Sequence, residues 1–354
     1  MNLKNLKYLL PLILFVTAIF SFHVKGILVY IPLFLAFFII PMFEFFLKPN
    51  SINMSAAEEE LAKVDKSYDL ILYAIVPLQF VSLFFFLKNI SDPSLTNLDM
   101  IGRIGVMGLL CGIFGINVGH ELGHRVNKSE QALAKMLLLT SMYMHFFIEH
   151  NKGHHKNVAT PEDPSSARYG EWLYAFYFRT IGKTYSSAWQ IAINDVVKKN
   201  KKAFSLHNEM IQFHLIQLSF LGFLFFSFGI STLLYFLIAA FIGILLLETV
   251  NYIEHYGLQR KKTDETNYER AQPHHSWNSN HVVGRLFLFE LSRHSDHHYM
   301  TSRKYQLLRH HDHSPQMPTG YPGMILLALL PPIWTFIMNQ KIKKFLINSD
   351  ANVD

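Results

Sequence analysis

Nineteen histidines occur among the 354 residues, and nine of them form four short groups whose spacing suits metal binding. Side chains three or four residues apart on a helix lie on one face, about 5–6 Å apart at their β-carbons, so two such imidazoles can bind one ion. Nine ring nitrogens that converge in space could hold two metal ions. The groups are His120 and His124, then His150, His154 and His155, then His255 alone, and last His294, His297 and His298.

Cysteine chemistry is excluded from such a centre. Cys111 is the only cysteine, so no disulfide can form within the chain and no cysteine-based zinc or iron–sulfur site can be built. Any metal must use histidines and carboxylates, and imidazole suits zinc, copper, iron and nickel. The other histidines show no clear ligand pattern and stay unassigned: His23, His145, His207, His214, His274, His275, His281, His310, His311 and His313.

The composition indicates that membrane helices position these groups. Half of the residues are hydrophobic, 31 are phenylalanines and only 16% are charged, which is unusual for a soluble domain. A spanning helix needs roughly 17–25 residues. We predict one all-α integral-membrane domain over residues 1–354 with about six transmembrane helices, the first of them retained rather than cleaved as a signal peptide. The apolar stretches are 8–22, 27–43, 70–87, 104–118, 213–229 and 231–247.

The distribution of positive charge predicts the orientation. The polar regions 125–206 and 251–321 carry twelve and nine lysines and arginines, whereas the connection 89–101 carries none. Positive residues prefer the cytoplasmic side, so we expect both regions, both termini and the histidine groups to lie there. Because topology accounts for the net charge of +6, we predict no nucleic-acid partner.

Two further apolar stretches are predicted not to cross the membrane. A crossing at 132–148 would put His150 on the opposite side from His120. The stretch 321–338 is broken by Pro331 and Pro332, which cannot continue a helix begun before them. Both are expected to lie on the membrane surface or to dip into it, so that the histidine groups share one cytoplasmic cap.

The motif HELGHR allows a second interpretation. It matches the H-E-x-x-H pattern of zinc proteases, in which His120 and His124 would bind zinc and Glu121 would be the general base. Such a site uses one zinc ion, three protein ligands and an open position. Seven of the nine histidines would then have no role, and this surplus favours a dinuclear centre.

The motifs around the histidines resemble those of the integral-membrane alkane hydroxylases, or alkane 1-monooxygenases, within the membrane fatty-acid desaturase and hydroxylase superfamily. The histidine boxes are typical of the superfamily, whereas ATPEDPSSAR, NYIEHYGL, SWNSNH and PTGYPGMILLALLPPIW point to the alkane hydroxylases. The resemblance runs from about residue 100 to 340. Ser292 and Tyr299 depart from the usual pattern beside the last box, and Arg125 stands where the family often has lysine.

This resemblance implies a non-haem diiron enzyme. The nine histidines would hold two iron ions, and the enzyme would use O2 to hydroxylate n-alkanes to 1-alkanols. Electrons would come from a separate rubredoxin, reduced by an NAD(P)H-dependent rubredoxin reductase, on the cytoplasmic side of the bacterial inner membrane. Neighbouring carboxylates are expected to orient imidazoles by accepting their second ring N–H: Glu121, Glu149, Asp163, Glu254 and Asp296.

Two other hypotheses stay open beside the zinc protease. A related membrane diiron desaturase or hydroxylase, acting on fatty acyl chains or aromatic methyl groups, would use the same histidines and differ in its product. A non-catalytic metal carrier or sensor would be expected to place ionisable groups near the middle of the membrane. Here the histidine groups stand at the ends of apolar stretches.

Overall fold

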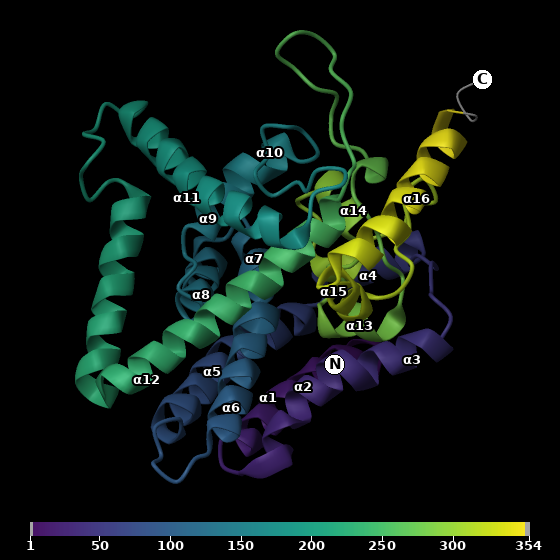
Figure 1. Cartoon of the computed structure of the whole chain (residues 1–354). Helices are drawn as coiled ribbons and strands as arrows, with labels where there is room; N and C mark the ends of the chain where they lie inside the picture. Colours follow the sequence, from purple (N-terminus) through teal and green to yellow (C-terminus); the bar gives the residue numbers. More distant parts are fainter. Residues whose placement is uncertain (1–2, 351–354) are drawn as a thin grey trace.

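Helices joined by loops make up residues 3–350, the part that this computed structural model describes. In that range the only β pairings are two isolated bridges, Lys262–Tyr268 and Asn278–Gln316. Figure 1 shows long helices below a cap of short helices and loops. The prediction of an all-α protein is confirmed.

The N-terminal apolar hairpin consists of short helical pieces, and two of these pieces begin at a proline. Pro32 and Pro41 stand in the first turns of α2 and α3, within a helical run that is continuous from Gly26 to Phe46. The π-helical stretch η3 joins the two. The pieces are η1 (Leu3–Leu12), α1 (Ile13–Ser21), η2 (Gly26–Tyr30), α2 (Ile31–Phe34), η3 (Leu35–Ile39) and α3 (Ile40–Phe46).

Four helical runs are long and apolar enough to cross a membrane, judged by length and composition. The first apolar run, Asn5–Ser21, is helical but shorter. One of the four is a continuous run of α6 (Asn97–Leu110), η4 (Cys111–Ile116) and α7 (Asn117–Gly123), which ends at the first histidine pair. The others are Gly26–Phe46, α5 (Ser67–Asn89) and α12 (Glu209–His255).

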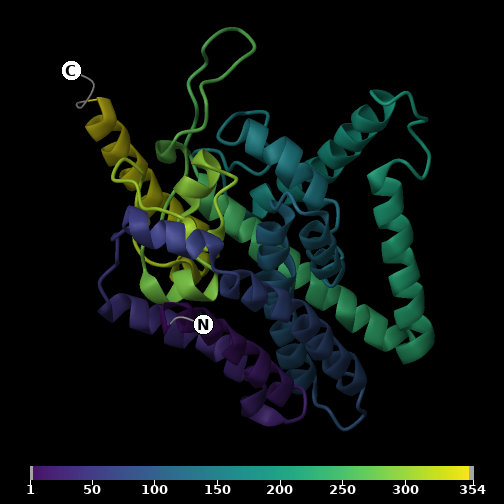
Figure 2. The same ribbon diagram turned by 180° about the vertical axis from the view of Figure 1, so that it is seen from behind.

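The helix α12 contains two of the predicted spans. Gly229 interrupts it with φ 81° and ψ 171°, a conformation that is open to glycine and costly for other residues. Figures 1 and 2 show that the half before Gly229 stands apart from the bundle, whereas the half after it crosses the bundle towards the cap. With α12 counted twice, the six predicted apolar segments are all helical.

The two apolar stretches predicted not to cross are both interrupted. α8 (Lys128–Leu139) ends before a turn in which Met142 has φ 53°, and α9 (Phe146–Glu149) follows. α15 (Tyr321–Ala328) and α16 (Pro331–Asp350) separate at the proline pair. None of these four described helices is both long and apolar enough to span a membrane.

Two further helices lie outside the predicted apolar stretches. α4 (Ala56–Val64) begins at a capping box in which Ser55 and Glu58 satisfy each other's backbone N–H groups. α11 (Leu173–Val197) buries a stripe of residues three or four apart, although its overall composition is mixed. The stripe is Leu173, Phe176, Thr180, Thr184, Ala188 and Ala192.

Buried carboxylates tie the cap to the N-terminal helices. Glu290 accepts hydrogen bonds from Tyr8 Oη at 2.7 Å and from Arg285 Nε at 2.6 Å. Glu44 of α3 accepts the backbone N–H of Gly284 at 2.8 Å. The remaining cap elements are η5 (His150–His154), α10 (His155–Asn157), η6 (Pro273–His275), α13 (Val282–Phe287), α14 (His294–Tyr299) and η7 (Tyr305–Leu307).

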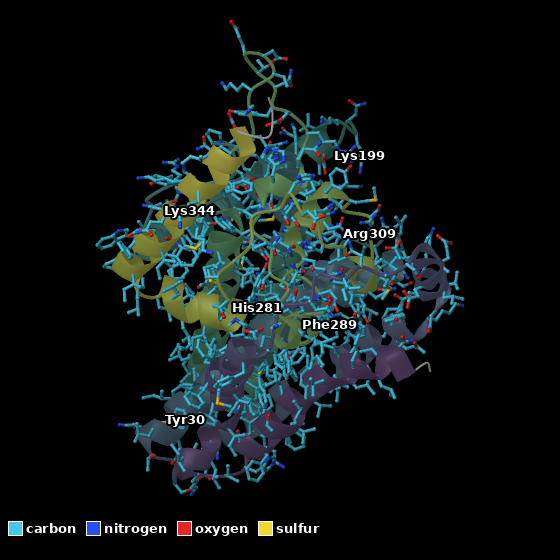
Figure 3. The ribbon with its side chains drawn as sticks, turned by 90° about the vertical axis from the view of Figure 1, so that its right-hand side faces the viewer. Tyr30, Lys199, His281, Phe289, Arg309 and Lys344 are labelled. Carbon is cyan, nitrogen blue, oxygen red and sulfur yellow. The ribbon has the colours of Figure 1, made fainter. Side chains whose placement is uncertain are left out.

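The two basic polar regions share one end of the molecule. In Figure 3, Lys199 and Arg309 lie on the cap side, and Tyr30 lies at the opposite, apolar end. The segregation of charge therefore agrees with the prediction that 125–206 and 251–321 face the same side.

We expect Gly229→Ala to destabilise the protein by about 1–3 kcal/mol, because alanine must adopt the same strained backbone conformation. The measurement is the thermal unfolding midpoint in detergent. Gly222→Ala in the same helix is the control: a β-carbon there meets open space, and alanine favours the helix. Equal midpoints for the two variants would contradict a required kink at Gly229.

Candidate metal centre

Four separate segments of the chain bring the nine predicted histidines together at the base of the cap. The first pair comes from α7 and its C-terminal residue, and the second group comes from η5 and α10. His255 is the last residue of α12, and α14 carries the remaining three. The nine form two groups: His120, His124, His150, His155 and His297 in one, and His154, His255, His294 and His298 in the other.

A π-helical turn divides the second sequence group between these two clusters. The N–H of His155 bonds to the carbonyl of His150 five residues earlier, so these two side chains lie on one face. Their Nε2 atoms are 2.9 Å apart. His154 turns to the other cluster, where its Nε2 is 3.2 Å from Nε2 of His298.

Within each cluster the Nε2 atoms face one another at the spacing of neighbouring ligands around one ion. In the five-histidine cluster, His120 Nε2 lies 3.0 Å from Nε2 of both His124 and His297. In the four-histidine cluster, His294 Nε2 lies 3.1 Å from that of His255 and 2.9 Å from that of His298. Ligands at about 2.1 Å from a metal, as imidazole nitrogens are, have this separation. Converging lone pairs repel one another unless a cation lies between them.

The hydrogen bonds of His154 fit metal binding. Its Nδ1 lies 2.9 Å from Asp163 Oδ2, and Asp163 in turn accepts bonds from Ser166 Oγ and the Ser165 backbone N–H. An acceptor at Nδ1 holds the proton there and leaves the Nε2 lone pair for a metal. Burial raises and the neighbouring His154 ring lowers the pKa of Asp163, and the net effect is a pKa below its usual range.

Burial favours the neutral, ligand-competent form of most clustered imidazoles of the cap. Burial lowers the pKa of His150, His155 and His298 well below the ordinary value, and neighbouring rings lower it further. Burial alone would also lower the pKa of His154, but Asp163 outweighs it and raises that pKa. The donor set of neutral nitrogens with no thiolate suits a first-row transition metal such as iron.

The other predicted carboxylates have different partners. Glu121 accepts a bond from Arg125 Nη2 at 2.6 Å and from the backbone N–H of Tyr305 at 3.1 Å. Asp296 bonds to Arg303 and His311. These two therefore do not orient ligand rings, because each points away from the face of its helix that carries the histidines. Glu149 contacts Ser187 Oγ at 3.4 Å, and Glu254 lies beside His294.

A third group, Glu269, His274 and His275, also brings potential ligands close together. The backbone N–H of Gln272 donates to Nδ1 of His275 at 3.0 Å. The proton of this ring therefore sits on Nε2, which lies 3.2 Å from Glu269 Oε1. The ring of His275 is used in a hydrogen-bonded loop contact, so it does not offer a free Nε2 lone pair as the rings of the two histidine clusters do.

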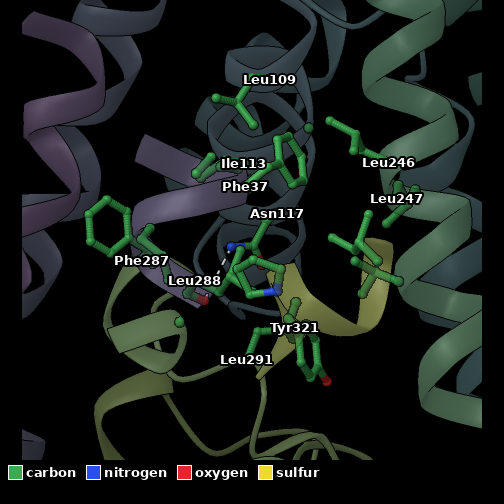
Figure 4. A pocket seen from close by; sticks show the side chains of 17 residues that line it. Phe37, Leu109, Ile113, Asn117, Leu246, Leu247, Phe287, Leu288, Leu291 and Tyr321 are labelled. Carbon is green, nitrogen blue, oxygen red and sulfur yellow. Dashed lines mark hydrogen bonds between the residues drawn. The ribbon is translucent and has the colours of Figure 1, made fainter. Parts of the chain in front are cut away.

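An apolar pocket lies between the spanning helices and the cap helices α13 and α15 (Figure 4). Three of its lining residues stand three to five positions before clustered histidines on the chain: Asn117, Val250 and Leu291 precede His120, His255 and His294. The Asn117 amide donates to the Leu288 carbonyl at 3.2 Å. The other walls of the pocket include Phe37, Leu109, Ile113 and Leu246.

A polar cleft opens onto the centre from the cap side. It is lined by one histidine of each cluster, His155 and His298, and by Lys156, Arg260 and Arg270. Tyr299, one of the two departures from the resembled pattern, lines the same cleft. Ser292, the other departure, is buried and does not line it. Cationic side chains thus surround the opening through which the clusters face solvent.

Comparison with known proteins shows the relationships of the chain. Residues 103–328 match the fatty acid desaturase family. The alkane 1-monooxygenase of Acinetobacter baylyi is 38% identical over 86% of this chain and 74% of its own length. Alkane 1-monooxygenase 1 of Pseudomonas aeruginosa is 44% identical over 69% of this chain and 65% of its own. That of Ectopseudomonas oleovorans is 39% identical over 80% and 71%.

Replacing one histidine from each cluster is expected to remove a different metal ion. His154→Ala and His297→Ala should each lower the metal content from two ions to about one per chain, because each takes away one Nε2 ligand. Metal analysis of protein purified under reducing conditions measures this.

His145→Ala is the matched control, because His145 is a partly buried histidine that belongs to neither cluster. It should keep both ions. Full metal content in both cluster variants, or equal loss in the control, would contradict the assignment of the ligands.

Proposed function

Because the chain belongs to the fatty acid desaturase family and, within it, to the alkane 1-monooxygenases, we propose that it uses O2 to hydroxylate the terminal methyl group of n-alkanes. The observation that supports this most is the apolar pocket, because its lining residues Asn117, Val250 and Leu291 stand three to five positions before clustered histidines. The overall reaction consumes an alkane, O2, two electrons and two protons, and forms a 1-alkanol and water.

We propose two iron ions as the cofactor, one in each histidine cluster. When bound, the iron pair supplies the reduction of O2 and the oxidation of the C–H bond. The protein residues bind and orient the substrate. Burial of each CH2 group in the pocket contributes about 0.8 kcal/mol, so an alkane without polar groups can still be held. The narrow apolar walls direct one end of the chain towards Asn117, one helical turn before His120.

The two rival functions differ in what the geometry supports. A zinc protease needs Glu121 free to act as a base, whereas its carboxylate is bonded to Arg125 and to the Tyr305 N–H. A desaturase or hydroxylase of acyl or aromatic substrates would share the histidines. Of the side chains that line the pocket, only Asn117 and Tyr321 carry polar atoms, which favours an unsubstituted hydrocarbon.

The electron donor that we propose is a rubredoxin, reduced by an NAD(P)H-dependent rubredoxin reductase. The cationic cleft leads to His155 and His298 and so offers a docking site for an acidic protein. The same basic regions are expected to face the cytoplasm at the bacterial inner membrane. The alkane would enter from the bilayer, and the donor from water.

Product analysis tests the reaction. Purified protein in lipid nanodiscs, supplied with rubredoxin, reductase, NADPH and labelled ¹⁸O2, should convert n-alkanes to 1-alkanols that carry one labelled oxygen. A double bond in an acyl chain would identify a desaturase, and peptide cleavage would identify a protease.

Ile113→Phe should lower kcat/KM for long alkanes about tenfold or more relative to short ones, because a phenyl ring fills the pocket. Ile101→Phe, at a side chain 59% exposed on α6, should leave the chain-length profile unchanged.

Removing one charge at the cleft is expected to weaken donor docking. Arg270→Gln should raise KM for rubredoxin about three- to tenfold with little change in kcat, and the effect should shrink at high salt. Lys201→Gln, in the polar loop between α11 and α12, is the control of equal charge change. A KM for rubredoxin that changes neither in Arg270→Gln nor with ionic strength would exclude this surface as the docking site.

A further inference from the structure

A cluster of lysines stands in the loop between α11 and α12, directly before the apolar part of α12. None of the four has an ion-pair partner among the described residues. Lysines immediately beside a membrane span attract anionic lipid headgroups. The preference of positive residues for one side of the membrane would account for the charge alone, so a lipid site requires geometric evidence as well. The lysines are Lys198, Lys199, Lys201 and Lys202.

Two of these lysines, Lys199 and Lys201, line a pocket where the end of α11 meets the start of α12. The two carboxylates of its wall are each paired with a lysine, in the pairs Lys152–Asp195 and Lys135–Glu209. The charge of Lys199 and Lys201 is therefore not neutralised by a described acid. Two neighbouring cations in a pocket can bind one phosphate group. The other walls are formed by Ile148, Ala192, Val196 and His207.

A helix-ending turn fixes the backbone of these two lysines. Asn200, between them, has φ 56°, the left-handed conformation that asparagine adopts more readily than most residues. The N–H of Lys201 bonds to the Val196 carbonyl at 3.1 Å. The N–H of Asn200 bonds to the Val197 carbonyl at 2.9 Å. This is the Schellman arrangement that ends many helices, so the turn is in place without a ligand.

The same loop exposes two large apolar side chains. Phe204 is 76% exposed and Leu206 is 67% exposed. The loop is nevertheless held in place, because Asn208 donates to the Ala203 carbonyl at 2.9 Å and Gln212 donates to the Leu206 carbonyl at 2.7 Å. Apolar side chains beside lysines match the boundary between headgroups and acyl chains. An acidic protein would complement the lysines but would leave the exposed apolar pair unexplained.

Aromatic side chains next to the loop indicate the same boundary. The Trp189 ring of α11 lies 6.4 Å from the Phe204 ring and 5.4 Å from the His214 ring, measured between centroids. The Tyr185 hydroxyl lies 2.8 Å from Nε2 of His214. Tryptophan and tyrosine concentrate at the membrane–water interface. Figure 1 shows this loop at the outer end of α11, away from α14 and its histidines.

We propose that this pocket and the loop 198–208 bind one anionic phospholipid. The lipid phosphate contacts Lys199 and Lys201, while Phe204 and Leu206 insert among the acyl chains. The site is separate from the metal centre and does not depend on the proposed reaction. Because residues of both α11 and α12 line the pocket, the bound lipid connects α11 to the half of α12 that stands apart from the bundle (Figures 1 and 2).

Lipid titration of the full-length protein tests the site. Protein in non-ionic detergent is titrated with phosphatidylglycerol or with phosphatidylcholine of equal chain length, and native mass spectrometry measures the dissociation constant of the first bound lipid. Phosphatidylglycerol should bind at least about tenfold more tightly than phosphatidylcholine. The double variant Lys199→Gln, Lys201→Gln should lose this preference, because each lysine near an anionic lipid surface contributes about a fivefold factor in affinity.

The double variant Lys261→Gln, Lys262→Gln is the matched control, because it removes the same charge from an exposed loop of the cap. It should keep the preference for phosphatidylglycerol. Equal affinities for the two lipids in the unmodified protein, or an unchanged preference in the variant of Lys199 and Lys201, would overturn the proposal. Inorganic phosphate that displaces the lipid at the concentration at which phosphatidylglycerol binds would identify a phosphate site instead.

Phe204→Ser provides a second, independent variant. It should weaken the binding of both lipids about threefold or more while the preference for phosphatidylglycerol remains, because it removes only acyl-chain contacts. Unchanged binding of both lipids in Phe204→Ser would overturn the insertion of the loop. Unchanged lipid binding in the variant of Lys199 and Lys201, together with a raised KM for rubredoxin, would assign the loop to the electron donor instead.

Discussion

Nine neutral imidazoles that meet nitrogen to nitrogen are favourable only around positive charge. The Nε2 atoms of each cluster lie about one ligand spacing apart, and burial lowers the pKa of rings such as His150 and His298. The rings come from four segments far apart in the sequence. The caps, turns and ion pairs around them can be understood as the means of holding these four segments in position against the mutual repulsion of their lone pairs.

The centre has two different environments on its two sides. Towards the spanning helices, Val250 and Leu291 lead into an apolar pocket, while towards the cap Lys156 and Arg270 line a polar cleft. Buried bonds such as Glu44 to the Gly284 N–H join the cap to the hairpins. A hydrocarbon and a charged redox protein can therefore reach one site without sharing a route.

Much of this arrangement could be predicted from residue types and spacing, and some could not. Apolar run lengths located the helices, and the histidine motifs named all nine clustered residues. The division of the nine histidines into clusters of five and four depends on the π turn at His150, and no local sequence pattern predicts that turn. α11 was not predicted, because polar residues lie between the members of its buried stripe. Glu121 was expected beside an imidazole, but tertiary contacts with Arg125 and Tyr305 outweighed its position in the motif.

The π turn at His150 makes the site sensitive to changes of chain length. His154 and His155 are neighbours in the chain but belong to different clusters, so the extra residue of the turn sets the phase between the two halves of the site. Without that residue the turn would return to the α-helical spacing, in which side chains four positions apart share a face. Because His154 and His155 are consecutive, any change of chain length before them moves a ligand of each cluster together.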